Sequence, residues 1–492
     1  MQKILLYISL FLIGICSLGT FLTVWFDEAY FAEITYQLLN SNGFHSQADT
    51  VSLDGKPVYI YGPVYFLLTS AVAWLTELSP FYFRLVNYLA YFGVVLLLGS
   101  NIHKNKLGYW GFLFSIVLFF DNAGFENALS GRMEAVALLF ALSSYLLYYQ
   151  FKVEKKDIYS FLIGLSVSLS FLTTPRAAIL LIPLFFIVIF DLIKLGNWKF
   201  FFTLALSFSI PVLIWILTSH GSLQAFIEYY TQNSSFESGE STLVEQYLYS
   251  GLRFTKVKMV VYTLFIFSFL VKRNLSKRDA FLVKVFGANA LLFIFLVNDT
   301  GSYFALVSPL MTYCIFVNLL HSNFKFKRSV LLIYSGFNLF MVTAKFAYNY
   351  LNEYKDYSPI LSMVEENIPN EATVITDFDF FYALREKNTN LYFFQMGKDP
   401  VTRTQYHINE LSPQYILTKI DDPKMSLYNK NFNYDIIARY PKKENPNYWI
   451  VEGYIKKLGG HFFTVDYENL VIYKLYPIES KTSINHSNLL NL

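Results

Sequence analysis

Long apolar stretches recur along most of this 492-residue chain, each close to the roughly 20 residues that a bilayer-spanning helix needs. Hydrophobic residues make up 54% of the chain and charged residues only 15%, and the mean hydropathy is +0.37. A soluble protein of this length carries more charge and less apolar surface. We therefore predict a polytopic α-helical membrane protein. About 11 transmembrane helices are expected, at 4–24, 82–100, 109–121, 133–151, 158–174, 176–190, 200–218, 257–271, 280–297, 303–320 and 329–347.

Loops rich in lysine and arginine alternate along the chain with loops that hold few of them, and this pattern predicts the orientation of the chain in the membrane. Short cytoplasmic loops carry an excess of these cations. The N-terminus and the basic loops, at 104–106, 152–156, 194–199, 272–278 and 325–328, are therefore expected inside. The opposite loops hold few cations, chiefly Lys56, Arg132, Arg176, Arg253 and Lys256.

The apolar segment 64–78 is short for a crossing. If it did cross, every later loop would change sides and the basic loops would face outward. We therefore expect it to lie along the outer interface as a juxtamembrane helix. The first external loop then runs from about 25 to 81, with a further helix at 29–39.

The composition changes after about residue 350, where turn residues begin to separate short β-prone runs. We predict a transmembrane region at 1–349, a small soluble α/β domain on the external side at 350–477, and a disordered tail at 478–492. Strands are expected at 373–376, 391–394, 415–418, 436–440, 461–465 and 470–475.

An acidic pair, Asp27-Glu28, follows directly on the first apolar segment. Two acids at the mouth of a transmembrane helix are costly at membrane depth, so they indicate function. The alternative is structural: Asp27 caps the helix that follows and Glu28 lies in its first turn.

Other polar residues fall on the same predicted face. An arginine binds a phosphate with a planar fork of donors, and a nearby carboxylate can accept a proton from a nucleophile. This face therefore suits chemistry on an anionic lipid headgroup, although the two arginines could instead extend to outer-leaflet headgroups. The candidates are Asp27, Glu28, Arg132, Glu134 and Arg176, with Tyr30, Lys56, Tyr59 and Tyr61 lining a substrate cavity.

Three motifs resemble the protein O-mannosyltransferase and lipid A aminoarabinose transferase families, which are polyprenyl-phosphate-sugar-dependent glycosyltransferases of the GT-C fold. The motif similarity covers roughly residues 1–190. The chain departs from these families where Glu134 replaces the usual aspartate and where the Glu-Lys of aminoarabinose transferases is missing. The motifs are Trp25-Phe26-Asp27-Glu28-Ala29-Tyr30, Tyr59-Ile60-Tyr61-Gly62-Pro63 and Arg132-Met133-Glu134.

The resemblance implies a GT-C enzyme of the plasma (inner) membrane with its active site outside. It implies that Asp27 is the catalytic base, Glu28 and Glu134 are supporting acids, and Arg132 contacts the carrier phosphate. Arg176 is added on physical grounds, as a second cation for that phosphate. The expected partners are a polyprenyl-phosphate-linked sugar, a lipid, glycan or protein acceptor, and the bilayer. A single displacement would invert the configuration at the anomeric carbon of the sugar.

No cofactor is expected. Asp377-Phe378-Asp379 has the spacing of a metal-binding acidic pair, but no histidine or third acid lies nearby in the sequence. No motif indicates nucleotide binding, and we expect no nucleic-acid partner. A transporter or flippase of lipid-linked glycans is the alternative function, and it would place ionisable residues deep inside the spans.

Overall fold

The protein is described by a computed structural model, in which the contacts divide the chain into two compact units. Unit 1 comprises Met1–His45, Pro57–Glu353 and Asn445–Val465, and unit 2 comprises Ser46–Lys56, Tyr354–Glu444 and Asp466–Leu492. The structure describes residues 2–18, 24, 26–44, 61–104, 108–228, 256–296, 303–351, 356–387, 389–393, 407–420, 422, 425–429, 431–440, 467 and 469–477.

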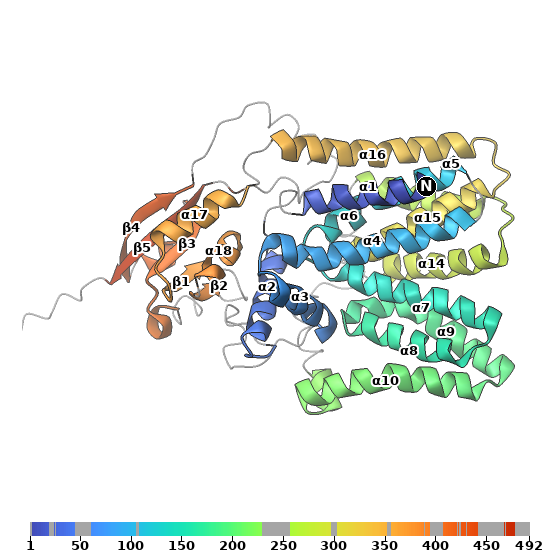
Figure 1. The fold of residues 1–492 in the computed structure, drawn as a ribbon, viewed down its shortest axis with the longest axis horizontal. Coiled ribbons are helices and arrows are strands. Elements are labelled where there is room, and N and C mark those ends of the chain that lie inside the picture. Colours follow the sequence, from blue (N-terminus) through green and yellow to red (C-terminus); the bar gives the residue numbers. More distant parts are fainter. Residues whose placement is uncertain are drawn as a thin grey trace, which may run out of the picture. The chain divides into compact units, whose positions relative to one another are not determined.

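Unit 1 is a bundle of helices whose long members run side by side, as Figure 1 shows. Its helices are α1 (Gln2–Ser17), α2 (Phe26–Leu39), α3 (Pro63–Leu75), α4 (Pro80–Lys104), α5 (Tyr109–Phe119), α6 (Asn122–Ala128), α7 (Glu134–Glu154), α8 (Asp157–Phe171), α9 (Ala178–Leu195), α10 (Trp198–His220), α13 (Lys256–Leu270), α14 (Lys277–Leu296), α15 (Ser308–Leu320) and α16 (Lys327–Leu351). Two 3-10 helices, η2 (Pro175–Ala177) and η3 (Tyr303–Leu306), precede α9 and α15.

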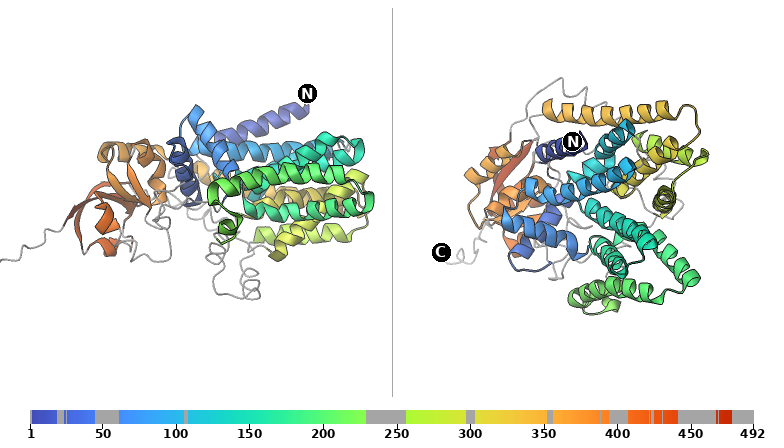
Figure 2. Two further views of the ribbon diagram at one scale, coloured as in Figure 1. Left: turned by 90° about the horizontal axis from the view of Figure 1, so that it is seen from below. Right: turned by 45° about the vertical axis from the view of Figure 1, so that its right-hand side comes forward.

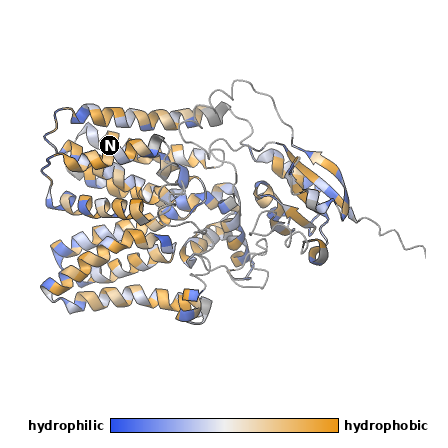
Figure 3. Cartoon of the chain, turned by 180° about the vertical axis from the view of Figure 1, so that it is seen from behind, coloured by the Kyte–Doolittle hydropathy of each residue, from blue (hydrophilic) through white to orange (hydrophobic). Residues whose placement is uncertain are grey.

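The surface of the bundle is apolar, as a lipid-facing surface must be. Phe185, Phe186 and Phe190 of α9 are each at least 60% exposed, and Figure 3 shows hydrophobic residues along most of the bundle helices. Among the described residues, five helices are long and apolar enough to cross a membrane: Pro80–His103, Glu134–Glu154, Pro175–Lys194, Trp198–Ser219 and Lys327–Ala347. The chain is therefore a multi-pass membrane protein.

A helix lies at each of the eleven predicted spans, although the number that cross stays a prediction. The segment predicted at 303–320 is not one continuous helix. It begins as the 3-10 helix η3, and α15 starts only at Ser308, where Pro309 at the first turn suits a new helix start. The break brings Tyr303 to the end of the bundle that carries the candidate site.

Helices α2 and α3 pack against each other at one end of the bundle (Figures 1 and 2). Helix α3 has 13 residues and is about 20 Å long, which is shorter than the apolar core of a bilayer. It begins at a close backbone contact, because Val64 N donates to Leu172 O at 3.1 Å. A Cβ on Gly62 would lie 1.9 Å from the same oxygen, so this position requires glycine.

Unit 2 contains a five-stranded sheet in the order β2-β1-β3-β5-β4. Strands β1 (Thr373–Thr376), β2 (Asn390–Phe393) and β3 (Tyr415–Lys419) are parallel, while β5 (Leu470–Pro477) is antiparallel to β3 and to β4 (Phe432–Arg439). Helices α17 (Ser358–Asn367) and α18 (Phe381–Glu386) complete the α/β pattern. Strand β4 starts four residues before its predicted beginning, and the strand predicted at 461–465 lies outside the described residues.

Candidate active site

The acidic pair lies in the first turn of α2, which begins at Phe26. Asp27 is therefore inside the helix and is not its N-cap, so the capping alternative is wrong. The side chain of Glu28 is fully buried against Arg84 of α4, which is 1% exposed. Arg84 Nε and Nη2 donate to the two carboxylate oxygens at 2.9 and 2.8 Å, and its Nη1 donates to Leu18 O at 3.0 Å.

A tight turn between α6 and α7 places Arg132 beside this pair. Gly131 has φ +65°, and a Cβ there would lie 2.9 Å from Glu28 Cγ and 3.0 Å from the ring of Phe83. Glycine is therefore required for both its conformation and its size. The hydroxyl of Tyr65 in α3 donates to Gly131 O at 2.7 Å and fixes the turn from the other side.

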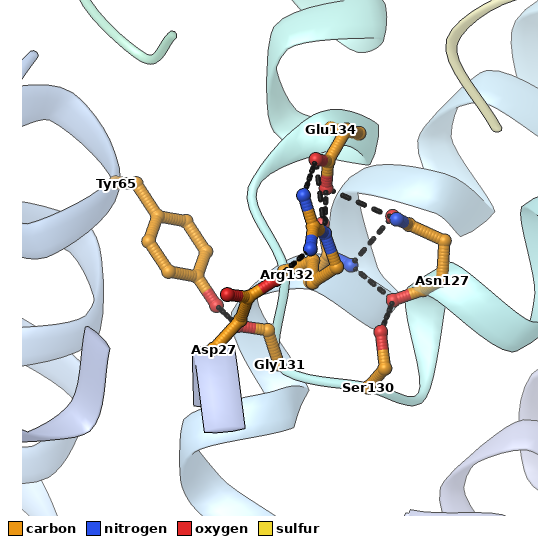
Figure 4. Close-up of polar contacts among 8 residues, drawn as sticks. Asp27, Tyr65, Asn127, Ser130, Gly131, Arg132 and Glu134 are labelled. Atoms are coloured by element: carbon orange, nitrogen blue, oxygen red, sulfur yellow. Dashed lines mark hydrogen bonds and ion pairs between the residues drawn. The ribbon is translucent and has the colours of Figure 1, made fainter. Parts of the chain in front are cut away.

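Arg132 joins two carboxylates, one from each side of the site (Figure 4). Its Nε lies 3.0 Å from both Glu134 oxygens and its Nη2 lies 2.6 Å from Glu134 Oε1, while its Nη1 pairs with Asp27 Oδ2. Arg132 and Glu134 are 4% and 3% exposed, whereas Asp27 is 22% exposed. Asp27 is thus the most accessible of these three charged groups.

Burial by itself lowers the pKa of Arg132, but Glu134 and then Asp27 outweigh burial and raise that pKa above its usual value. The guanidinium therefore stays charged. An arginine that extended to lipid headgroups would be exposed at its tip. The burial of Arg132 between two acids rules out that alternative for this residue.

Arg176 comes to the same site through a ring. It lies in η2, and its guanidinium carbon is 4.0 Å from the ring centroid of Tyr303. The guanidinium carbon of Arg132 is 5.0 Å from the same centroid. Two predicted phosphate ligands, from separate parts of the chain, thus share one aromatic ring.

The predicted cavity residues are only partly described. Tyr30 is 8% exposed in α2, and the half-buried Tyr61 packs edge-to-face on Phe31 with the ring centroids 5.0 Å apart. Lys56 and Tyr59 lie outside the described residues.

No family model matches the sequence, and no curated protein does. Among solved structures, the chain is similar to ArnT from Cupriavidus metallidurans bound to undecaprenyl phosphate, with a TM-score of 0.60, 11% identity, and 96% of this chain and 97% of that chain covered. The apo state of the same ArnT matches at a TM-score of 0.56, with 11% identity and the same coverage. Arabinosyltransferase EmbB from Mycobacterium smegmatis matches at a TM-score of 0.46 with 14% identity, over 62% of this chain and 29% of that chain.

The chain has the GT-C fold. The ArnT match extends over nearly both chains, and it confirms the fold that the three motifs implied. At 11% identity the similarity establishes the fold and not the substrate.

Several residues that build this GT-C site were missed from the sequence. Arg84 lies within the predicted span 82–100, and an arginine in an apolar span was a signal for a buried partner. Asn127 donates to Glu134 Oε2 at 3.0 Å, and its own carbonyl accepts from Asn87 at 2.7 Å. Tyr303 carries no local signal, because the two arginines that it contacts lie 171 and 127 positions away in the sequence. Asn127 lies only seven positions before Glu134, but nothing in its own sequence surroundings distinguishes it.

A second ion pair connects α16 to α6. Lys345 of α16 is 1% exposed and lies 3.0 Å from Glu126 Oε1. Lys345 lies near the end of the span predicted at 329–347. The pair holds α6, which presents Asn127 to Glu134.

The acidic pair Asp377 and Asp379 lies in unit 2, at the carboxyl end of β1. Asp377 accepts a hydrogen bond from Thr418, which also lies 2.9 Å from Asp422. Within the described part of the chain, no group of three histidine, cysteine or acidic residues could hold a metal ion.

Proposed function

We propose that this chain is a membrane glycosyltransferase that moves a sugar from a polyprenyl-phosphate-linked donor to an extracytoplasmic acceptor with inversion. The single observation that supports this most is the joining of Asp27, Arg132 and Glu134 at one end of a GT-C bundle, with Arg176 on the same aromatic ring as Arg132. This arrangement combines an accessible carboxylate with two fixed cations, which are the groups that the reaction needs.

In the proposed reaction, Asp27 accepts the proton of the acceptor hydroxyl. The hydroxyl oxygen attacks the anomeric carbon from one side while the bond to the phosphate oxygen breaks on the other, so the configuration inverts. The polyprenyl phosphate departs with the bonding electron pair and gains a second negative charge. Arg132 and Arg176 stabilise that charge as it develops.

Asp27 suits the role of base better than the other two acids do. It is 22% exposed, whereas Glu28 is fully buried in a two-point pair with Arg84 and Glu134 is 3% exposed beneath Arg132. A substrate hydroxyl therefore reaches Asp27 most readily. Glu28 and Glu134 act as positioning residues, because each holds an arginine or a turn in place.

Polyprenyl phosphate is the proposed leaving group, on the motif resemblance and on the ArnT structure that contains undecaprenyl phosphate. Tyr30, Lys56, Tyr59 and Tyr61 are proposed to line the sugar and acceptor cavity. The GT-C region at 1–349 performs catalysis in the plasma membrane, with its active site on the extracytoplasmic side. The region at 350–477 is extracytoplasmic too.

The experiment that tests this function compares sugar transfer by wild type and Asp27→Asn, using a synthetic polyprenyl-phosphate sugar. The amide keeps the size of the side chain but cannot accept the proton, so turnover should fall by at least about 100-fold. Binding of undecaprenyl phosphate should persist in the variant and serves as the control for folding. Near wild-type turnover in Asp27→Asn would exclude Asp27 as the base. A profile of carrier-linked sugars, before and after deletion of the gene, would identify the donor.

A further inference from the structure

Tyr303 holds a place in the site that the reaction itself does not require. It opens the 3-10 helix η3, and its ring faces both Arg132 and Arg176. The two guanidinium carbons lie 5.0 and 4.0 Å from the centroid of this one ring. The two cations are therefore no farther apart than these two distances together, although 44 residues separate them in the sequence.

The rest of η3 is buried, which fixes the ring. Phe304, Ala305 and Leu306 are all at most 5% exposed. The ring of Phe304 packs against Tyr262 of α13 with the centroids 5.4 Å apart. Tyr303 is the half-buried member of η3, so its ring projects from a rigid base toward the two arginines.

An aromatic ring can bring two like charges together at low cost. The negative face of the ring attracts each guanidinium, and this offsets part of their mutual repulsion. The N–H groups of a guanidinium lie in its plane, and a contact with the face of a ring does not use them up as hydrogen-bond donors to an oxygen. A carboxylate in place of Tyr303 would also attract both arginines, but it would compete with a phosphate for the same N–H groups.

We propose that Tyr303 is a positioning residue that holds Arg132 and Arg176 so that both bind one anionic headgroup, the phosphate of the polyprenyl carrier. This inference rests on the proposed function. The face of the ring is what acts, and the hydroxyl is not needed. Tyr303 thereby sets the affinity for the carrier phosphate, while Asp27 determines the rate of the chemical step.

The test measures binding of undecaprenyl phosphate to the purified full-length protein in nanodiscs. Tyr303→Leu removes the ring and should weaken binding about tenfold. Tyr303→Phe keeps the ring and should bind within about twofold of wild type. Replacing Tyr303 by pentafluorophenylalanine keeps the shape but reverses the charge distribution of the face, so it should weaken binding as Tyr303→Leu does.

A matched control lies between α7 and α14, where the guanidinium carbon of Arg278 is 5.8 Å from the ring centroid of the half-buried Tyr149. Tyr149→Leu removes a ring–arginine contact outside the site and should leave binding within about twofold of wild type.

Wild-type affinity in Tyr303→Leu or in the pentafluorophenylalanine variant would overturn the inference. The pentafluorophenylalanine variant retains the shape of the side chain, so it serves as the test even if Tyr303→Leu fails to fold. An equal loss in Tyr303→Phe would transfer the role to the hydroxyl and also overturn it. Failure of the wild type to bind undecaprenyl phosphate would overturn the proposed function together with this inference. Weak binding by Tyr303→Leu beside tight binding by wild type supports both.

Discussion

Single residues in this site have separate tasks because their surroundings differ. Asp27 and Glu28 are adjacent in sequence, yet one is 22% exposed and the other is fully buried. Consecutive helical positions point about 100° apart, so one faces the site and the other faces α4. Their different partners, Arg132 and Arg84, then decide which acid a substrate can reach.

At Arg132, the planar fork should matter as much as the charge. Arg132→Lys keeps the charge but cannot hold Glu134 at two points while also pairing with Asp27. We expect transfer to be substantially impaired in Arg132→Lys and more strongly impaired in Arg132→Ala, by about 2–4 kcal/mol in the activation barrier. Steady-state transfer from a synthetic polyprenyl-phosphate sugar measures this effect. Arg273→Lys, in a predicted cytoplasmic loop, is the matched control and should remain active. Full activity of Arg132→Lys would show that only a positive charge is needed there.

The elements of unit 1 are joined at the site by buried ion pairs that connect helices far apart in the sequence. Glu28 of α2 meets Arg84 of α4, and Lys345 of α16 meets Glu126 of α6. A buried pair is not necessarily stabilising overall, because desolvation offsets its attraction. Its strongest effect is on geometry, since an unpaired buried charge is costly and the two helices must therefore stay in register.

The pair between α2 and α4 can be tested by removing one partner. Arg84→Met leaves the Glu28 carboxylate buried without its cation and should destabilise the protein by about 3–5 kcal/mol. Thermal melting of the purified protein reports the loss. The double variant Arg84→Met with Glu28→Gln should recover part of it, because the uncompensated charge is gone. The exposed pair of Lys199 and Asp157 provides the control, and Lys199→Met should change stability by less than about 1 kcal/mol. An equally small effect of Arg84→Met would show that water solvates the Glu28 carboxylate when Arg84 is absent.

In unit 2, Asp379 lies in a short 3-10 helix (Phe378–Phe380) that follows β1, and it should make the stability of the sheet depend on pH. Burial raises the pKa of Asp379 to about 7, Lys419 opposes that rise and Asp377 adds to it. Between about pH 4 and pH 7 the folded state keeps this proton and the unfolded state does not, so stability falls as pH increases and levels off above pH 7. The loss is on the order of 4 kcal/mol.

Hydrogen exchange at β1 and β3, corrected for the intrinsic pH dependence, measures this change in the full-length protein. Asp379→Asn has no proton to lose and should flatten the profile and strengthen protection above pH 7. If the variant kept the wild-type slope, another group would be responsible.

For the whole molecule, the orientation in the membrane follows from loop charge and can be tested with reporters. We expect the N-terminus inside, 11 spans, and the region after residue 350 outside, with segment 64–78 not crossing. A fusion after residue 105 should report from the cytoplasm and a fusion after residue 350 from the outside. An external signal at the first position, or a cytoplasmic one at the second, would contradict this orientation.

The sequence alone was enough to predict a multi-pass membrane protein, because a bilayer demands long apolar helices. The GT-C fold followed from the resemblance of the Asp27-Glu28 and Arg132-Met133-Glu134 motifs to those of known GT-C families, and the structural comparison confirms it. Only the tertiary structure decided the partners: that Glu28 pairs with Arg84, that Arg132 joins two acids, and that Tyr303 lies under two arginines. The physical reason is that apolar periodicity specifies where helices lie in the chain, but not how each is rotated or which helix it meets. Contacts between residues that are far apart in the sequence, such as Arg132 and Tyr303 at 171 positions or Glu126 and Lys345 at 219, depend on that rotation and packing.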